Sequence, residues 1–295
     1  MPKLKATWNT LQHLVRHEAN KEQPLGPLKR FIGWQILKRA NNEPITIDAF
    51  GGGRLRCYPE NSPSNAVVYF GWPDWAEMQL LRELLRTDDT FFDIGANVGV
   101  YSVLASTLVG SNGQVLAFEP DPINAEKLRA NFLLNDLPVD DVHQVAVGEE
   151  SGTRRFANNK GSIGSLLPDG AVNGIDVVCK KLDDIISDPI GTYIAKVDVE
   201  GFELGVMKGA SELLASHSIK AMIIETNDCC KHLGQTRAEL QKFLNEFGYS
   251  FFGVDVSADG IRLDPIPLEG AYPSNSLALC DLDWIKQRVS GIIVN

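Results

Sequence analysis

The chain has 295 residues, enough for one large or two small domains, and its 44% hydrophobic and 22% charged content is ordinary for a protein that buries a full core. Its formal net charge of −10 argues against a general nucleic-acid-binding surface, because phosphate contacts need clustered lysine and arginine side chains. We expect a cytoplasmic protein for three reasons. The cysteines have no paired spacing, no apolar stretch is long enough to span a membrane, and the sequence does not start with the apolar core of a signal peptide.

Residues 1–75 predict an N-terminal extension of helices and a hairpin that packs on the rest of the chain without a flexible linker. We expect this extension to form a lid or a wall of the substrate pocket. Apolar residues recur with helical spacing at positions 4, 8, 11 and 15 and again between residues 28 and 36. Basic residues flank the second stripe, namely Lys29, Arg30, Lys38 and Arg39. A basic amphipathic helix can lie on a membrane surface or cover an active site, although packing on the core with a solvated basic face is commoner.

Residues 45–50 and 54–58, separated by three glycines, predict a β-hairpin. The segment 61–64 is rich in turn residues, and we interpret the apolar run 67–70 as a further short strand. Asp74 is expected to cap the helix that follows. We place the domain boundary at residue 75, so that residues 76–295 form the second domain.

Residues 90–108 predict a buried strand, a tight glycine turn and an apolar helix. This is the first unit of a doubly wound α/β sheet, in which ligands bind at the carboxyl ends of the strands. We expect Gly95 and Gly99 to let the backbone approach a ligand, because neither carries a Cβ. The next strand, 114–118, ends in Glu119, twenty residues past Gly99, the spacing at which a carboxylate binds a ribose diol. The motif therefore predicts a nucleoside cofactor.

The residue before the turn, Asp93, indicates which nucleoside cofactor to expect. A nicotinamide dinucleotide would bring a pyrophosphate to this turn, and an acidic neighbour would repel it. S-adenosylmethionine carries a sulfonium and an ammonium but no phosphate, so it suits Asp93. The alternatives are a nicotinamide-dependent oxidoreductase, a non-catalytic nucleoside-binding module, and a plain strand-to-helix turn with a surface glutamate.

Five further strands are predicted at residues 142–147, 193–199, 219–224, 251–256 and 276–280, with helices between most of them. This alternation predicts a mostly parallel seven-stranded sheet with helices on both faces. A short gap turned by residues 258–260 predicts an antiparallel hairpin at one edge. We interpret the proline-rich segment 261–272 as an excursion without a strand.

A second group of charged residues, Lys196, Asp198 and Glu200, points to one face of the fourth core strand. Buried charges are costly unless they pair or contact a ligand, so these side chains should sit near the Asp93 turn either as a site or as an internal ion pair. With Glu225 and Asp228, the two carboxylates could also bind a divalent cation, although the spacing is not diagnostic and we assign no metal site.

Four blocks taken together resemble the FkbM family of S-adenosylmethionine-dependent methyltransferases: residues 92–99, 118–120, 182–184 and 196–203. The resemblance covers roughly residues 75–280 and implies a class I methyltransferase (Rossmann-like) fold. It also implies methyl transfer to a hydroxyl of a sugar, polyketide or other secondary metabolite. By this resemblance the methionine end of the cofactor is held by Asp93, Gly95, Asn97 and Gly99, its ribose is held by Glu119, and Asp198 and Glu200 belong to the active centre.

The predicted mechanism needs a base, because a protonated hydroxyl is a poor nucleophile. Asp198 is our first candidate and Glu200 the second, with His232 a further possibility. A small-molecule hydroxyl acceptor is the expected partner, and the first ninety residues carry no block that would identify it.

Overall fold

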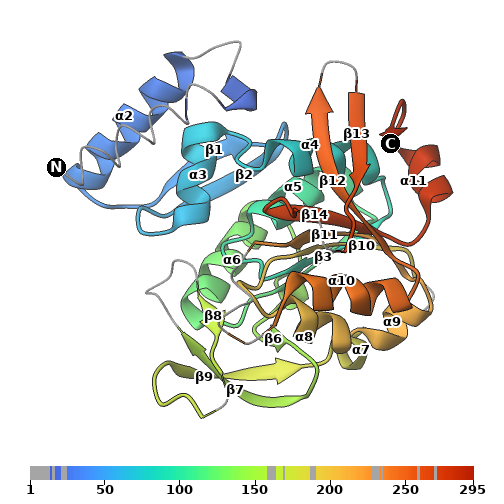
Figure 1. The fold of residues 1–295 in the computed structure, drawn as a ribbon. Coiled ribbons are helices and arrows are strands. Elements are labelled where there is room, and N and C mark those ends of the chain that lie inside the picture. The colour runs from blue at the N-terminus through green and yellow to red at the C-terminus, as the bar shows by residue number, and fades with distance from the viewer. Residues whose placement is uncertain are drawn as a thin grey trace.

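Strand β3 (Thr90–Ile94) lies inside a nine-stranded sheet of order β15-β13-β12-β14-β11-β10-β3-β4-β5 in the computed structural model. The structure describes residues 14, 17–20, 25–157, 164–168, 170–186, 191–227, 233, 235–257, 260–268 and 271–295. The five strands from β11 to β5 run parallel, and β12 and β14 are antiparallel to their neighbours (Figure 1). The other strands are β4 (Gln114–Phe118), β5 (Val142–His143), β10 (Tyr193–Val197), β11 (Ile219–Glu225), β12 (Ser250–Ser257), β13 (Gly260–Pro265), β14 (Asn275–Leu279) and β15 (Ile293–Val294).

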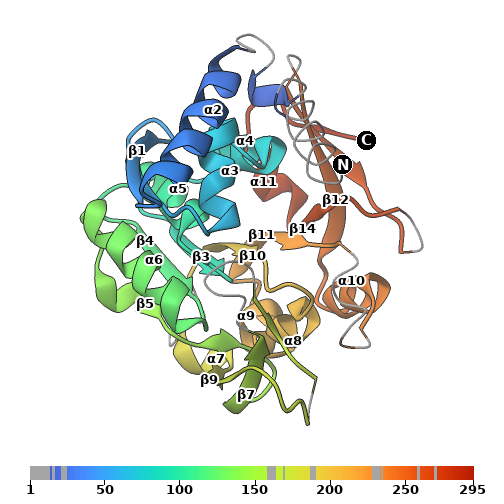
Figure 2. The same ribbon diagram turned by 90° about the vertical axis from the view of Figure 1, so that its left-hand side faces the viewer.

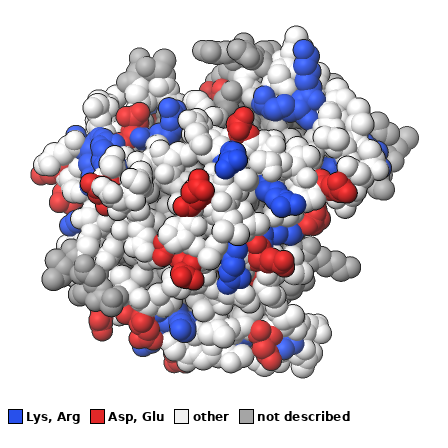
Figure 3. All heavy atoms as spheres, turned by 180° about the vertical axis from the view of Figure 1, so that it is seen from behind, with Lys and Arg blue, Asp and Glu red and all other residues white. Residues whose placement is uncertain are grey.

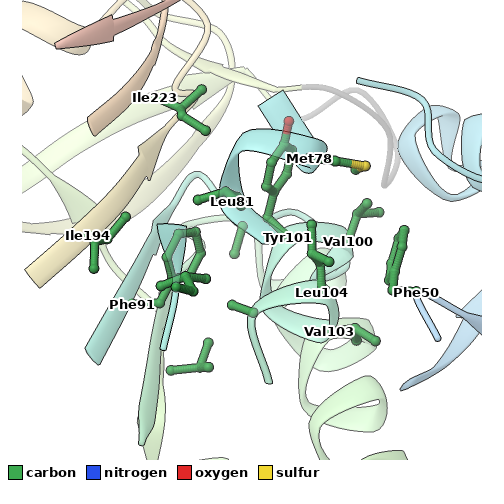
Figure 4. Packing of buried hydrophobic residues seen from close by; sticks show 14 of the residues in the cluster. Phe50, Met78, Leu81, Phe91, Val100, Tyr101, Val103, Leu104, Ile194 and Ile223 are labelled. Carbon is green, nitrogen blue, oxygen red and sulfur yellow. The ribbon is translucent and has the colours of Figure 1, made fainter. Parts of the chain in front are cut away.

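Helices cover both faces of this sheet because alternate side chains of each strand belong to two different apolar clusters. Phe91 packs in the first cluster with residues of α4 (Trp75–Leu84), α5 (Val100–Val109), α6 (Pro122–Leu134) and α11 (Leu282–Arg288). Figure 4 shows Phe91, Ile194 and Ile223 of three neighbouring strands beside Leu81 and Leu104 of the helices. Phe92 packs in the second cluster with residues of α7 (Leu182–Ile185), α8 (Glu203–Lys208), α9 (Ser211–Ala215) and α10 (Arg237–Glu246). The predicted mostly parallel α/β fold is confirmed.

Nine strands form this sheet where the sequence predicted seven. The segment interpreted as an excursion contains β13, in which Ile261 and Leu263 are buried while Arg262 is exposed, and this alternation pairs it with β12. The predicted hairpin therefore joins β12 to β13, and β14 pairs with the other side of β12. The short β15 then adds to β13.

The strand predicted at residues 142–147 is divided between two sheets. Val145 N donates to His143 O at 2.9 Å, which bends the chain after β5. The next strand, β6 (Ala146–Val147), joins a second, four-stranded sheet of order β6-β9-β7-β8. Its other strands are β7 (Gly152–Ala157), β8 (Ser165–Leu166) and β9 (Ile175–Lys180).

The N-terminal extension consists of α2 (Leu25–Ala40), the predicted hairpin of β1 (Ile45–Ala49) and β2 (Gly53–Cys57), and α3 (Ser62–Phe70). The run 67–70, expected to be a strand, belongs to α3, because Asn61 caps that helix and Pro63 lies in its first turn. Side chains of α6 hold the hairpin to the core: Asn131 Oδ1 accepts from Arg56 N at 2.7 Å. The first predicted helix, near residues 4–15, falls almost wholly outside the described residues.

Charged side chains are mixed in sign over the face seen in Figure 3, where basic and acidic residues alternate. On this face neither sign of charge predominates among the described residues. Among the residues that the structure describes, no helix has the length and apolar character needed to cross a bilayer.

The β3 turn requires glycine at position 95, where φ is +85° and an added Cβ would lie 1.8 Å from Asp198 O. We expect Gly95→Ala to destabilise the protein by about 1–2 kcal/mol for the left-handed backbone and by about 1–3 kcal/mol more for the clash. Gly51→Ala is the matched control, because Gly51 has φ +78° and no atom within 4 Å of the added Cβ. Urea unfolding measures both variants, and an equal loss in the two would contradict the packing argument.

Candidate active site

A cavity of about 340 Å³ opens at the carboxyl ends of β3, β4 and β10. Parallel strands end at the same edge of a sheet, so residues that follow different strands meet there. Six of the seven residues predicted from the sequence line the cavity, namely Asp93, Gly95, Asn97, Glu119, Asp198 and Glu200. The seventh, Gly99, is the N-cap of α5 and does not line it.

Asp93 lies next to the last residue of β3 and is almost fully buried. One of its oxygens accepts a hydrogen bond from Ser102 Oγ at 2.5 Å. Burial raises the pKa of Asp93 to about 6, although the Ser102 hydroxyl and the positive charge of Lys196 both oppose the shift. The site therefore holds a carboxylate that a positively charged ligand would favour in its ionised form.

Glu119 follows β4 and joins the glycine turn to the start of α6. Its Oε2 accepts from Asn97 N and its Oε1 accepts from Asp121 N, both at 2.8 Å. Burial raises the pKa of Glu119 to about 8, and these two backbone donors only partly offset that effect. Each carboxylate oxygen has a second acceptor position, so Glu119 can hold the turn and still accept a hydroxyl donor from the cavity.

At Gly95 and Gly99 the space that a Cβ would occupy is filled by protein atoms, whereas the sequence led us to expect a ligand there. A Cβ at position 95 would meet the backbone of Asp198, and one at position 99 would lie 2.6 Å from Leu128 Cδ1. Asn97 also has a positive φ of 52°, and its Oδ1 accepts from Asn61 Nδ2 at 2.6 Å. Glycine is thus needed here to pack the turn against β10 and α6.

Lys196 is a buried residue of strand β10, two positions before Asp198. Its Nζ donates to Asp198 Oδ2 at 3.0 Å and to Asn275 Oδ1 at 3.1 Å. Burial disfavours the charge, but the carboxylates of Asp198 and Asp74 outweigh it and raise the pKa of Lys196. The internal ion pair that the sequence allowed is therefore present, and it leaves Asp198 on the cavity wall.

Glu200 stands in a turn with a positive φ of 55°, followed by Gly201 at φ 105°. The buried Glu203 holds this turn, since its Oε1 accepts from Val199 N at 3.3 Å and from Gly201 N at 3.0 Å. The arrangement fixes the direction in which Glu200 leaves the backbone, at the edge of the cavity.

Three carboxylates meet at this edge, because oxygens of Asp198, Glu200 and Glu225 lie within 4.8 Å of one another. Burial, followed by the charges of Asp198 and Glu200, raises the pKa of Glu225 to about 9. Such a set offers the oxygen ligands that magnesium prefers, but Lys196 already compensates part of its charge. Asp228 and His232, which the sequence analysis also considered, lie outside the described residues.

A second wall of the cavity comes from the N-terminal extension, which was expected to form a lid or wall of the substrate pocket, although its individual residues were not selected from the sequence. It comes from α3 and the residues before α4, and its members are Ser62, Pro63, Ala66, Pro73 and Asp74. Asp74, expected to cap α4, makes no such bond and accepts instead from Tyr101 OH at 2.8 Å. The capping pattern of Asn61 and Pro63 could have identified α3 as a helix, but not its position over the cavity.

A family model described as the methyltransferase FkbM domain matches residues 93–251 of the chain. The hexuronic acid methyltransferase AglP of Haloferax volcanii is 28% identical over 180 residues, which cover 57% of this chain and 66% of that protein. The 31-O-demethyl-FK506 methyltransferase FkbM of Streptomyces tacrolimicus is 29% identical over 191 residues, which cover 53% of this chain and 72% of that protein. Methyltransferase sdnD of Sordaria araneosa is 31% identical over 165 residues, which cover 43% of this chain and 62% of that protein. The chain thus spans about two thirds of the length of these relatives.

Two solved structures are similar to the chain at low identity and with TM-scores below 0.5. A methyltransferase FkbM from Methylobacillus flagellatus KT is 17% identical with a TM-score of 0.42, covering 85% of this chain and 59% of that one. A methyltransferase from Pyrococcus furiosus is 15% identical with a TM-score of 0.40, and the match covers 86% of this chain and 98% of that one.

The raised pKa of Glu225 makes the carboxylate cluster testable through the pH dependence of stability. In the unfolded state Glu225 has its ordinary pKa of 4.5, so ionisation of this side chain favours unfolding. The stability that the protonated side chain contributes is therefore complete at low pH and is lost as pH rises toward about 9. Glu225→Gln, which does not titrate, should therefore lose stability less steeply than the wild type over this range, by up to about 1.4 kcal/mol per pH unit.

The measurement is urea unfolding at a series of pH values with EDTA present, because a bound cation would favour the ionised form. Glu246→Gln, at an exposed position of α10, is the matched control. Parallel pH profiles for the wild type and Glu225→Gln would refute the assigned shift.

Proposed function

The chain belongs to the FkbM methyltransferase family, and we propose that it transfers the methyl group of S-adenosylmethionine to a hydroxyl of a small molecule. The observation that carries this proposal is the pair of buried carboxylates, Asp93 and Glu119, on the wall of one cavity at the ends of neighbouring strands. We retain residue 75 as the proposed start of the methyltransferase domain. Residues before it supply the second wall described above.

The charges that line the cavity support S-adenosylmethionine over a nicotinamide dinucleotide. Among the described lining residues there are five carboxylates and one lysine, and that lysine is already paired with Asp198. The carboxylates are Asp74, Asp93, Glu119, Asp198 and Glu200. A pyrophosphate would meet repulsion here, whereas a sulfonium and an ammonium would be attracted.

Residue roles follow from position along the cavity wall. Asp93 would hold the ammonium of the cofactor, since a cation beside this buried carboxylate compensates its desolvation. Glu119 would accept hydrogen bonds from the ribose hydroxyls. The turn of Gly95, Asn97 and Gly99 would enclose the methionine end, and its shape is fixed by contacts to Asp198, Glu119 and Leu128.

When bound, S-adenosylmethionine supplies a methyl group activated by its own sulfonium. The chain has to orient the acceptor hydroxyl and take its proton, and Asp198 is the proposed base. Lys196 fixes the orientation of Asp198 by donating to Oδ2. Glu200 lies within the same carboxylate cluster and is the second candidate.

The acceptor class is proposed from the relatives and from the cavity. Two of the relatives are named as methyltransferases of a hexuronic acid and of 31-O-demethyl-FK506, which supports a sugar or polyketide hydroxyl. The excess of carboxylates among the described lining residues favours a neutral acceptor over an acidic one.

Cofactor choice is tested by calorimetry with S-adenosylhomocysteine and NAD. We expect the first to bind and the second not to bind. Glu119→Ala should weaken binding by about 1.5–3 kcal/mol, because it removes charge-assisted hydrogen bonds. Glu119→Gln keeps the side-chain shape, and Glu126→Ala changes an exposed glutamate of α6 as a control. Unchanged affinity in both Glu119 variants would remove this residue from the site.

The base is tested with Asp198→Asn, which keeps the shape of the side chain but removes the proton acceptor. Turnover should fall by a factor of about 10²–10⁴ while cofactor affinity changes little. Acceptors come from a screen of neutral sugars and polyketides beside their acidic counterparts. Asp283→Asn, an exposed position far along the chain, is the control.

Two other results would give Asp198 a different role. Silencing of the wild type by a chelator would make it a metal ligand. A lower melting temperature with full turnover per folded molecule would leave it only the partner of Lys196, and attention would move to Glu200.

A further inference from the structure

The outer face of α2 carries a line of exposed apolar side chains. Leu25, Ile32 and Ile36 are 69%, 50% and 61% exposed, respectively. They are spaced seven and four residues apart, so at about 3.6 residues per turn they form one stripe along the helix. We call these three residues the outer stripe. Large apolar side chains gathered on one face normally mark a contact surface.

Basic residues border the outer stripe. In helical projection Lys29 lies on one side of it and Arg39 on the other. The helix contains two further basic residues and no acidic one, in a chain whose formal net charge is −10. The helix therefore differs in charge from the protein as a whole.

The opposite face of α2 is fixed to α3, so the outer stripe cannot turn inward. Trp34 is buried, and its Nε1 donates to Asn65 Oδ1 at 2.6 Å. Arg30 Nε donates to Val68 O at 3.1 Å, and Gln35 Nε2 donates to Tyr69 OH at 2.9 Å. Figures 1 and 2 show α2 at the periphery of the molecule, next to α3.

We propose that α2 binds the surface of an anionic phospholipid membrane, with the outer stripe in the headgroup and acyl boundary. An interfacial helix has apolar residues on the buried face and lysine or arginine at its borders, where they reach lipid phosphates. Both features occur together on α2. A stable interface with a second protein copy needs about 800 Å² on each partner, more than three side chains of one helix provide.

Membrane binding would be peripheral and would bring the cavity close to the lipid. The structure describes no helix able to cross the bilayer. Residues of α3 that line the cavity, such as Ala66, lie one helix layer away from the outer stripe. This inference is independent of the proposed methyl transfer, because its test needs no catalysis.

The test is co-sedimentation of the full chain with vesicles of phosphatidylcholine alone or mixed equally with phosphatidylserine. We expect binding to the mixed vesicles that weakens with added salt. Ile32→Gln with Ile36→Gln should reduce binding at least tenfold. Lys29→Gln with Arg39→Gln should reduce it by about fivefold for each charge and flatten the salt dependence.

Matched controls change equivalent residues elsewhere. Leu133→Gln with Val172→Gln removes exposed apolar side chains, 65% and 88% exposed, and Lys242→Gln with Lys286→Gln removes two exposed charges. Circular dichroism verifies that each variant is folded. The proposal is overturned if the wild type does not bind mixed vesicles, or if both α2 variants bind as well as the controls. A dimer in light scattering that the isoleucine variant abolishes, without vesicle binding, would assign the face to a second copy.

Discussion

The backbone of the β3 turn lies directly against the backbone that leaves β10, and the site depends on this contact. Gly95 has no Cβ, so Asp198 O can occupy the space where one would stand, and Asp198 N donates to Ile94 O at 2.9 Å. The contact brings the carboxylate of β3 and those after β10 to one cavity. A larger residue at position 95 would separate them.

Bringing these carboxylates together has an electrostatic cost that the structure only partly offsets. Lys196 compensates Asp198, and Ser102 and backbone donors stabilise Asp93 and Glu119. The pKa values of Asp93, Glu119 and Glu225 are nevertheless all raised, because burial dominates. Unfavourable charge held in place by a rigid fold is a common property of binding sites, and here it would be relieved by a cationic ligand.

The N-terminal extension has two different faces. Its helix α3 contributes a wall of the cavity, while α2 packs on α3 and turns an apolar stripe bordered by basic residues outward. One short segment therefore connects the proposed acceptor site to the proposed membrane surface. The sequence suggested that α2 would show a solvated basic face, but its most exposed side chains include apolar ones.

Local sequence alone determined the strand–turn–helix unit, the position of Asp93 and Glu119, and the mostly parallel sheet, because strand alternation, glycine turns and helix spacing act over a few residues. It could not determine which distant side chains meet. The bond between Asp74 and Tyr101, the approach of Glu225 to Asp198 and Glu200, and the wall from α3 depend on how whole elements pack. The strand β13 likewise depends on its pairing with β12 on one side and with β15 on the other. Even the reason for Gly95 was decided by the tertiary structure, since the atom that excludes a Cβ is Asp198 O, which directly follows β10 and is distant from Gly95 along the chain.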